Sequence, residues 1–89
     1  MKSDVKAVRK TSTGAVFGGR TRLRGIILSS SGGAGAVTLQ DGNSVTQFQA
    51  DVPNGDVFSY NLAEDGIVFE GGMTISALSN AIVTVIIDK

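Results

Sequence analysis

The chain has 89 residues, with 12 glycines, one proline, equal numbers of acidic and basic side chains, and neither cysteine nor histidine. Without cysteine and histidine it has no disulfides, no Ser-His-Asp triad, no imidazole switch and none of the usual zinc ligands. A domain of this size is expected to keep about 4,900 Å² of accessible surface, which leaves its stability marginal and self-association as the remaining way to bury more. Composition therefore favours a small, oligomeric protein that is not an enzyme and binds no cofactor.

Short runs rich in β-branched and aromatic residues follow one another, separated by glycine, asparagine and aspartate every 8 to 12 residues or so. No segment carries an apolar stripe of helical period and length. We therefore predict an all-β fold, a small antiparallel β-sandwich or jelly roll of about eight short strands. The runs that we read as strands cover residues 5–10, 15–17, 21–30, 36–40, 45–51, 57–62, 67–69, 73–78 and 82–88.

Charge is uneven along the chain, because the first 24 residues carry seven of the eight basic side chains and the rest carries seven of the eight acidic ones. We divide the chain into a basic N-terminal arm, residues 1–14, and a β-sandwich domain, residues 15–89. The arm is expected to dock on an acidic partner through Lys2, Lys6, Arg9 and Lys10. Its apolar residues never form the run that a signal peptide needs, and no other run is long enough for a membrane helix, so we expect a cytoplasmic site of synthesis and no membrane partner.

Two apolar runs, residues 25–28 and 82–87, suit buried strands. The second is apolar on both faces, which indicates a central strand, a face turned toward another subunit, or some of each. We expect a subunit interface to include part of these runs, with Ile26, Leu28, Ile82 and Ile86 as candidates. By period-two alternation, Phe58, Tyr60 and Leu62 share one face, which we place in the core.

Arg20, Arg22 and Arg24 stand at period two and so project from one face of a strand. Three like charges on one face repel one another unless carboxylates lie close enough to neutralise them. Those carboxylates can lie on an adjacent strand or on a neighbouring subunit, and the spacing leaves both arrangements open. In either case the three arginines are candidates for a stabilising or an interface role.

Motifs with chemical meaning are weak in this chain. Residues 14–21 nearly spell a phosphate-binding loop, but a strand follows where a helix is needed, so we read a turn relaxed by glycine. Asp41-Gly42-Asn43 begins like a calcium loop, but Val45 and Val52 occupy ligand positions, so a structural turn is favoured. The scattered acids lack an aromatic cleft for sugar hydrolysis, and no aromatic residues interleave with the basic ones as nucleic-acid binding requires.

Strand and turn patterns across residues 15–88 resemble a recurrent structural module of tailed bacteriophages. The matching segments are Arg22-Leu23-Arg24-Gly25-Ile26-Ile27-Leu28, a Gly/Ser loop, Val37-Thr38-Leu39-Gln40-Asp41-Gly42, Asp65-Gly66-Ile67-Val68-Phe69 and Ile82-Val83-Thr84-Val85-Ile86. The resemblance implies a jelly-roll-like sandwich, commonly a homotrimer, located in the virion. It implies a decoration or cement protein of the capsid, with a receptor- or glycan-binding module of a tail fibre or knob as the alternative. The expected partners are further copies of the chain and a capsid or tail protein, not nucleic acid.

Overall fold

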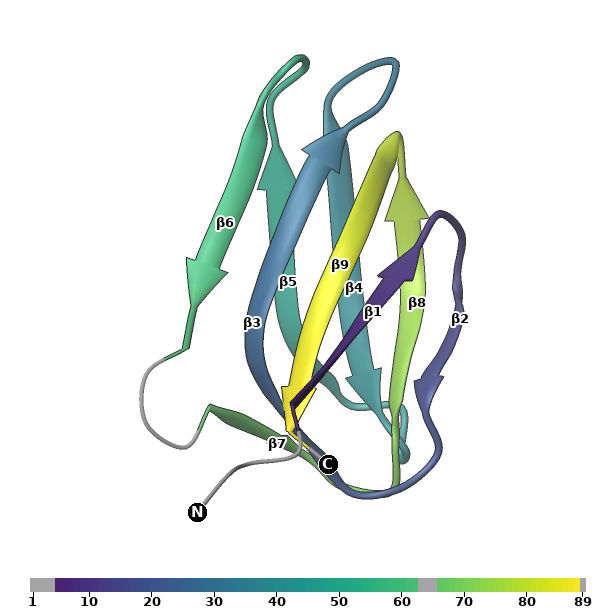
Figure 1. Ribbon diagram of the computed structural model, residues 1–89. Helices are drawn as coiled ribbons and strands as arrows, with labels where there is room; N and C mark the ends of the chain where they lie inside the picture. Colours follow the sequence, from purple (N-terminus) through teal and green to yellow (C-terminus); the bar gives the residue numbers. More distant parts are fainter. Residues whose placement is uncertain (1–4, 63–65, 89) are drawn as a thin grey trace.

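The computed structural model describes residues 5–62 and 66–88, which form nine β-strands and no helix (Figure 1). The prediction of an all-β fold is confirmed, and the strands fall within a residue or two of the predicted ranges. Their bounds are β1 (Val5–Lys10), β2 (Gly14–Phe17), β3 (Thr21–Ser30), β4 (Gly35–Asp41), β5 (Thr46–Val52), β6 (Val57–Asn61), β7 (Ile67–Phe69), β8 (Met73–Ser79) and β9 (Ala81–Asp88).

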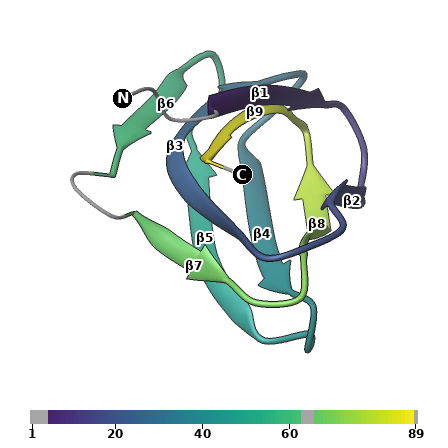
Figure 2. The same cartoon turned by 60° about the horizontal axis from the view of Figure 1, so that its bottom comes forward.

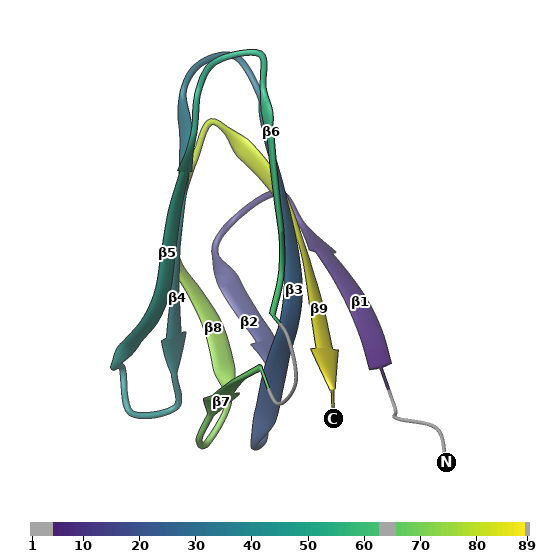
Figure 3. The same ribbon diagram turned by 90° about the vertical axis from the view of Figure 1, so that its left-hand side faces the viewer.

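The strands form two antiparallel sheets that pack face to face, as the side view shows (Figure 3). Sheet A has the order β1-β9-β3-β6, and sheet B has the order β2-β8-β4-β5. The pairs are nested around the β4–β5 hairpin, because β3 pairs with β6, β2 with β8 and β1 with β9. This nested pairing is the winding of a jelly roll. The short β7 is an addition to it, paired with the start of β3 at one end of the sandwich (Figure 2).

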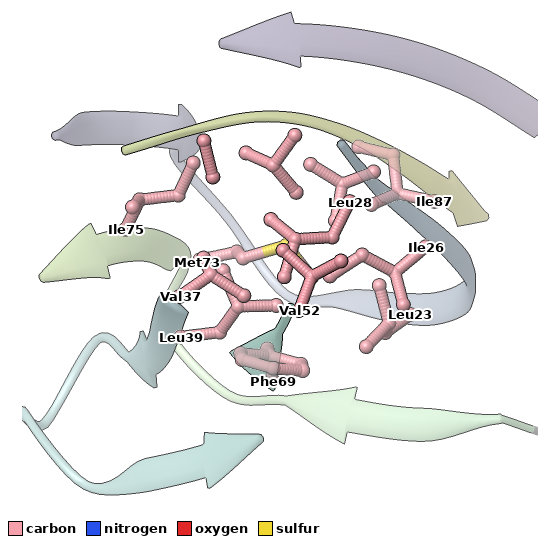
Figure 4. Close-up of a cluster of buried hydrophobic side chains, with 13 residues drawn as sticks. Leu23, Ile26, Leu28, Val37, Leu39, Val52, Phe69, Met73, Ile75 and Ile87 are labelled. Atoms are coloured by element: carbon pink, nitrogen blue, oxygen red, sulfur yellow. The ribbon is translucent and has the colours of Figure 1, made fainter. Parts of the chain in front are cut away.

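The core lies between the sheets and comes from the inward-facing half of each alternating strand. In β4 and β9 buried and partly exposed residues alternate without interruption. Inner residues of β3, β4, β5, β7, β8 and β9 form a cluster of 13 buried side chains (Figure 4). The accessible surface is 4924 Å², close to the value of about 4,900 Å² expected for this mass. The fold thus buries as much surface as is usual for a domain of this mass, and no more.

A β-bulge interrupts β3 at Arg24. Leu23 lies opposite Ile87 on β9, but Gly25 lies opposite Ile86, so Arg24 is one residue extra. Every side chain after the bulge therefore changes face relative to a regular strand. Gly25 faces outward beside Ile86, whose Cδ1 atom lies 3.5 Å from where a Cβ of residue 25 would stand. Because glycine leaves this space empty, Ile86 can lie across β3 at the bulge.

The turn between β4 and β5 is organised by Asp41, whose side chain is buried. Its Oδ1 atom accepts hydrogen bonds from the backbone N–H groups of Asn43 (2.9 Å) and Val45 (3.0 Å), and Oδ2 accepts one from Gln47 Nε2 (3.2 Å). The hydrogen bond from Val45 is the main cause that holds the pKa of Asp41 below its usual value, although burial opposes it. Both carboxylate oxygens of Asp41 accept hydrogen bonds from N–H groups of the protein. This is the arrangement of the structural turn that the sequence predicted.

This lowered pKa makes the contribution of Asp41 to stability dependent on pH. The contribution is complete above the unfolded-state pKa of about 4 and is lost as the pH falls through the lower folded-state value. We expect wild type to be more stable than Asp41→Asn at neutral pH and this difference to shrink below about pH 4. Urea unfolding of both proteins across this range checks the expectation, and a difference that stays constant with pH would contradict it.

Candidate interaction surface

The outer face of sheet A is the side of the sheet turned away from the core. Register and burial together define its members, because residues paired across an antiparallel sheet share a face. They are Ala7 and Arg9 on β1, Ile82, Thr84, Ile86 and Asp88 on β9, Arg22, Arg24, Gly25, Ile27 and Ser29 on β3, Val57, Ser59 and Asn61 on β6, and Val68 on β7. This face lies toward the viewer in Figure 1.

The middle of this face is apolar. Ile27 is 39% exposed and Val57 is 58% exposed, and Ile82 and Ile86 are partly exposed. Ile27 lies opposite Thr84, between the positions of Ile82 and Ile86 on the neighbouring strand, so these three isoleucines are close together. Two of the predicted interface residues, Ile82 and Ile86, are thus on the surface where a partner can reach them.

Ile26 and Leu28 are placed differently. They are 1% and 0% exposed and belong to the domain's own core, so no second subunit can contact their side chains. The physical reason is the bulge at Arg24, which reverses the alternation and turns Ile27 outward in their place. We therefore correct the candidate interface by removing Ile26 and Leu28 and adding Ile27. A glycine inside a strand, here Gly25, was the sequence signal for this bulge.

Charged groups form one end of the outer face of sheet A. Arg24 donates from a terminal guanidinium nitrogen to Asp88 Oδ2 at 3.0 Å, and Arg20 Nε donates to Glu70 Oε2 at 3.0 Å just beyond β3. Arg22 lies opposite Asp88 in the register and is also engaged. The prediction that carboxylates pair with the arginines is confirmed for Arg20 and Arg24, and both carboxylates belong to the same domain.

The two ion pairs differ in exposure, and their expected contributions differ accordingly. The side chains of Arg20 and Glu70 are 57% and 60% exposed, against 33% and 22% for Arg24 and Asp88. Solvent screens the exposed pair, so it should contribute almost nothing. For Arg24 and Asp88 we expect a coupling of about 1 kcal/mol in a double-mutant cycle with Arg24→Met and Asp88→Asn. A coupling no larger than that of Arg20 and Glu70 would contradict this reading.

The basic residues of the predicted arm divide between two faces. Residues 5–10 form β1, which pairs with β9 along its whole length. Lys6 and Lys10 lie opposite the inward-facing Ile87 and Val83, whereas Arg9 lies on the outer face of sheet A; Lys2 lies outside the described residues. Inward-pointing charges on an edge strand discourage another strand from pairing with it. In the structure, Lys6 and Lys10 therefore lie on an edge strand of sheet A, where their charges discourage pairing with another strand.

Tyr60 lies on the inner side of β6, next to β5, where the sandwich is open at its edge. Its ring stacks against Phe58 at a centroid distance of 6.2 Å and against Phe48 of β5 at 6.5 Å. Tyr60 as a whole is nevertheless 48% exposed, so the expectation of a core position is wrong for this residue. The reason is that β6 is the last strand of sheet A and only part of its inner side is covered.

Other candidate sites find no support in the part of the chain that the structure describes. Residues 14–21 form β2, a bend and the start of β3, as the reading of a turn predicted, and no helix begins there. No group of three potential metal ligands, no pocket and no helix long and apolar enough to cross a membrane occurs among residues 5–62 and 66–88.

Comparisons with known proteins give no relative. No family model, no curated protein and no solved structure matches the chain.

Proposed function

We propose that the chain is a structural protein of a viral particle that decorates or cements the capsid and performs no catalysis. The observation that carries the proposal is the outer face of sheet A, where apolar side chains meet a basic rim on a broad sheet. Exposed apolar area of this kind, bordered by polar groups, marks surfaces that bind other proteins. The kind of partner comes from the resemblance to phage structural modules.

The rim indicates the charge of the partner surface. Arg9, Arg22 and Arg24 stand on this face against one acidic residue among its described members, Asp88, which is paired with Arg24, so the face has a net positive charge. A shell protein with acidic groups around an apolar patch would complement it. Many copies on a regular shell would add their individual weak affinities by avidity. The resemblance also implies that copies associate with one another, as a homotrimer.

Sedimentation with undecorated heads of a tailed phage tests this proposal. Wild-type protein should sediment with the heads, and Ile27→Lys should reduce occupancy severalfold because it places an ammonium group in the apolar centre. Ala77→Lys is the control, since Ala77 is exposed on the outer face of sheet B. Absence of binding by the wild type, or equal loss with both variants, would contradict the proposal. Point substitutions suit this test better than removal of residues 1–10, which would remove β1 from the sheet.

One observation favours the alternative of a receptor- or glycan-binding module in a tail fibre or knob. The exposed ring of Tyr60, held by stacking on Phe58, is a surface on which the apolar face of a sugar can lie. A glycan array tests this alternative. Binding that disappears in Tyr60→Ala would favour it over capsid decoration.

A further inference from the structure

We propose that two copies of this chain pair edge to edge through β6, so that sheet A continues from one copy into the other and a dimer replaces the homotrimer that the resemblance implies. The first observation is the state of the five edge strands in the described sheets. β1 carries Lys6, Arg9 and Lys10. β2 has four residues and an irregular register, β7 has three residues, and the β4–β5 register shifts beside Thr46. Charges, short length and bulges are the features that keep an edge from pairing.

The five residues of β6 carry none of these protections; the charge nearest to the strand is Asp56, whose Oδ1 atom accepts a hydrogen bond from the Val57 N–H at 2.8 Å. β6 pairs with β3 in an unbroken register from Val57 to Asn61, and its five residues include no charge and no proline. Three of its five residues, Val57, Phe58 and Tyr60, are β-branched or aromatic, which favours strand pairing. Among the edge strands of the described sheets, β6 is thus the one suited to accept another strand.

Exposed apolar side chains gather around this edge. Of the four large hydrophobic residues that are exposed in the described chain, Val57 and Tyr60 belong to β6, and Ile27 lies next to it, opposite Ser59. Val57 and Ile27 are on the outer face, and Tyr60 is on the inner side. A strand added at this edge would cover exposed apolar side chains on both faces of the sheet. Pairing at β6 therefore accounts for the exposed apolar residues on each face.

The sequence of β6 is complementary to itself, which identifies the occupant as a second copy. In an antiparallel pair centred on Ser59, Phe58 stands opposite Tyr60 of the other copy, and Tyr60 stands opposite Phe58. Aromatic pairs across strands are among the favourable ones, and no like charges meet. Self-pairing of β1 would instead bring its basic residues together. The contact is isologous, so it closes with two copies.

The size of this side sets the expected strength of association. In a molecule of 38 × 27 × 16 Å, the side that measures 38 by 16 Å has an area of about 600 Å², against roughly 800 Å² per partner in a standard stable interface. We therefore expect a dimer that dissociates on dilution. The twofold axis stands perpendicular to the sheet, so both outer faces of sheet A point the same way. In this respect the inference deepens the proposed function, because a dimer presents two docking faces to one shell.

Mass measurement in solution tests the pairing. By light scattering or sedimentation, between about 1 μM and about 1 mM, wild type should pass from the 9.2 kDa chain to a species of twice that mass. Ser59→Lys should raise the dissociation constant roughly tenfold or more, because it places two ammonium groups opposite each other at the twofold axis. Ser76→Lys, at an exposed serine on β8 in sheet B, should leave the dissociation constant unchanged.

Mixing variants of opposite charge makes the test specific to this geometry. Ser59→Glu should also dissociate the dimer, and an equimolar mixture with Ser59→Lys should recover it, with a mass that falls as salt is raised. Circular dichroism verifies that each variant is folded. A wild type that stays monomeric, a trimer, or a dimer unaffected by both variants would overturn the pairing. None of these results bears on binding to heads, which the sedimentation experiment measures separately.

Discussion

Replacing Phe69 with alanine is expected to destabilise the domain by about 3 to 5 kcal/mol. Phe69 is fully buried and is the largest side chain in the core, where β7 closes one end of the sandwich (Figure 4). Its loss removes apolar burial and leaves a cavity between sheets that the backbone holds apart. A chain of this length has a total stability of about 5 to 13 kcal/mol, so the variant will approach or cross the limit of folding at ordinary temperature.

Urea or thermal unfolding measures this effect, with Tyr60→Ala as the matched aromatic control. Tyr60 is 48% exposed and lies at the sheet edge, so its replacement should cost about 1 kcal/mol, mainly through the lost ring contacts. Equal effects of the two substitutions would show that β7 does not close the core as described.

The second large effect is expected from Gly42→Ala, in the turn that follows β4. The turn packs directly on the backbone of Glu70 and Gly71, and Gly42 N–H donates to the carbonyl oxygen of Glu70 at 2.8 Å. A Cβ at residue 42 would lie 2.5 Å from the carbonyl carbon and oxygen of Gly71. Neither backbone segment can move without disturbing this hydrogen bond, so we expect the free energy of unfolding to fall by about 2 to 3 kcal/mol.

Gly18→Ala is the control for this substitution. A Cβ at residue 18 would meet no atom within 4 Å, and Gly18 has no positive φ, so alanine should change the melting temperature little. Unfolding of the three proteins in urea compares them directly. If Gly42→Ala were as stable as Gly18→Ala, the close packing of the two turns would be refuted.

Local chemistry explains why the strands could be predicted so closely. Turn residues such as Asp41-Gly42-Asn43 and Pro53-Asn54-Gly55-Asp56 end the strands at defined positions. The alternation of residues within β4 and β9 shows which side of each strand faces the core. Charge predicted that carboxylates face Arg20 and Arg24, since three aligned cations need counter-ions, but only the fold shows that these are Glu70 and Asp88 of the same domain.

The candidate surface could be predicted only in part, because it depends on two facts that lie outside local pattern. One is the bulge at Arg24, which exchanges Ile26 and Leu28 for Ile27 on the outer face. The other is the order of strands, which leaves β6 at an edge and so exposes Tyr60. Period-two alternation tells which residues share a face, but not whether another strand covers that face.

Hydrogen exchange at single amides, measured on wild-type protein at low and at high concentration, tests the β6 pairing most directly. If two copies join there, amides at the free edge of β6 should exchange more slowly as concentration rises, while those at the edges of β1, β2 and β5 keep their rates. Exchange in β6 that does not depend on concentration, or slowing at another edge instead, would contradict the pairing.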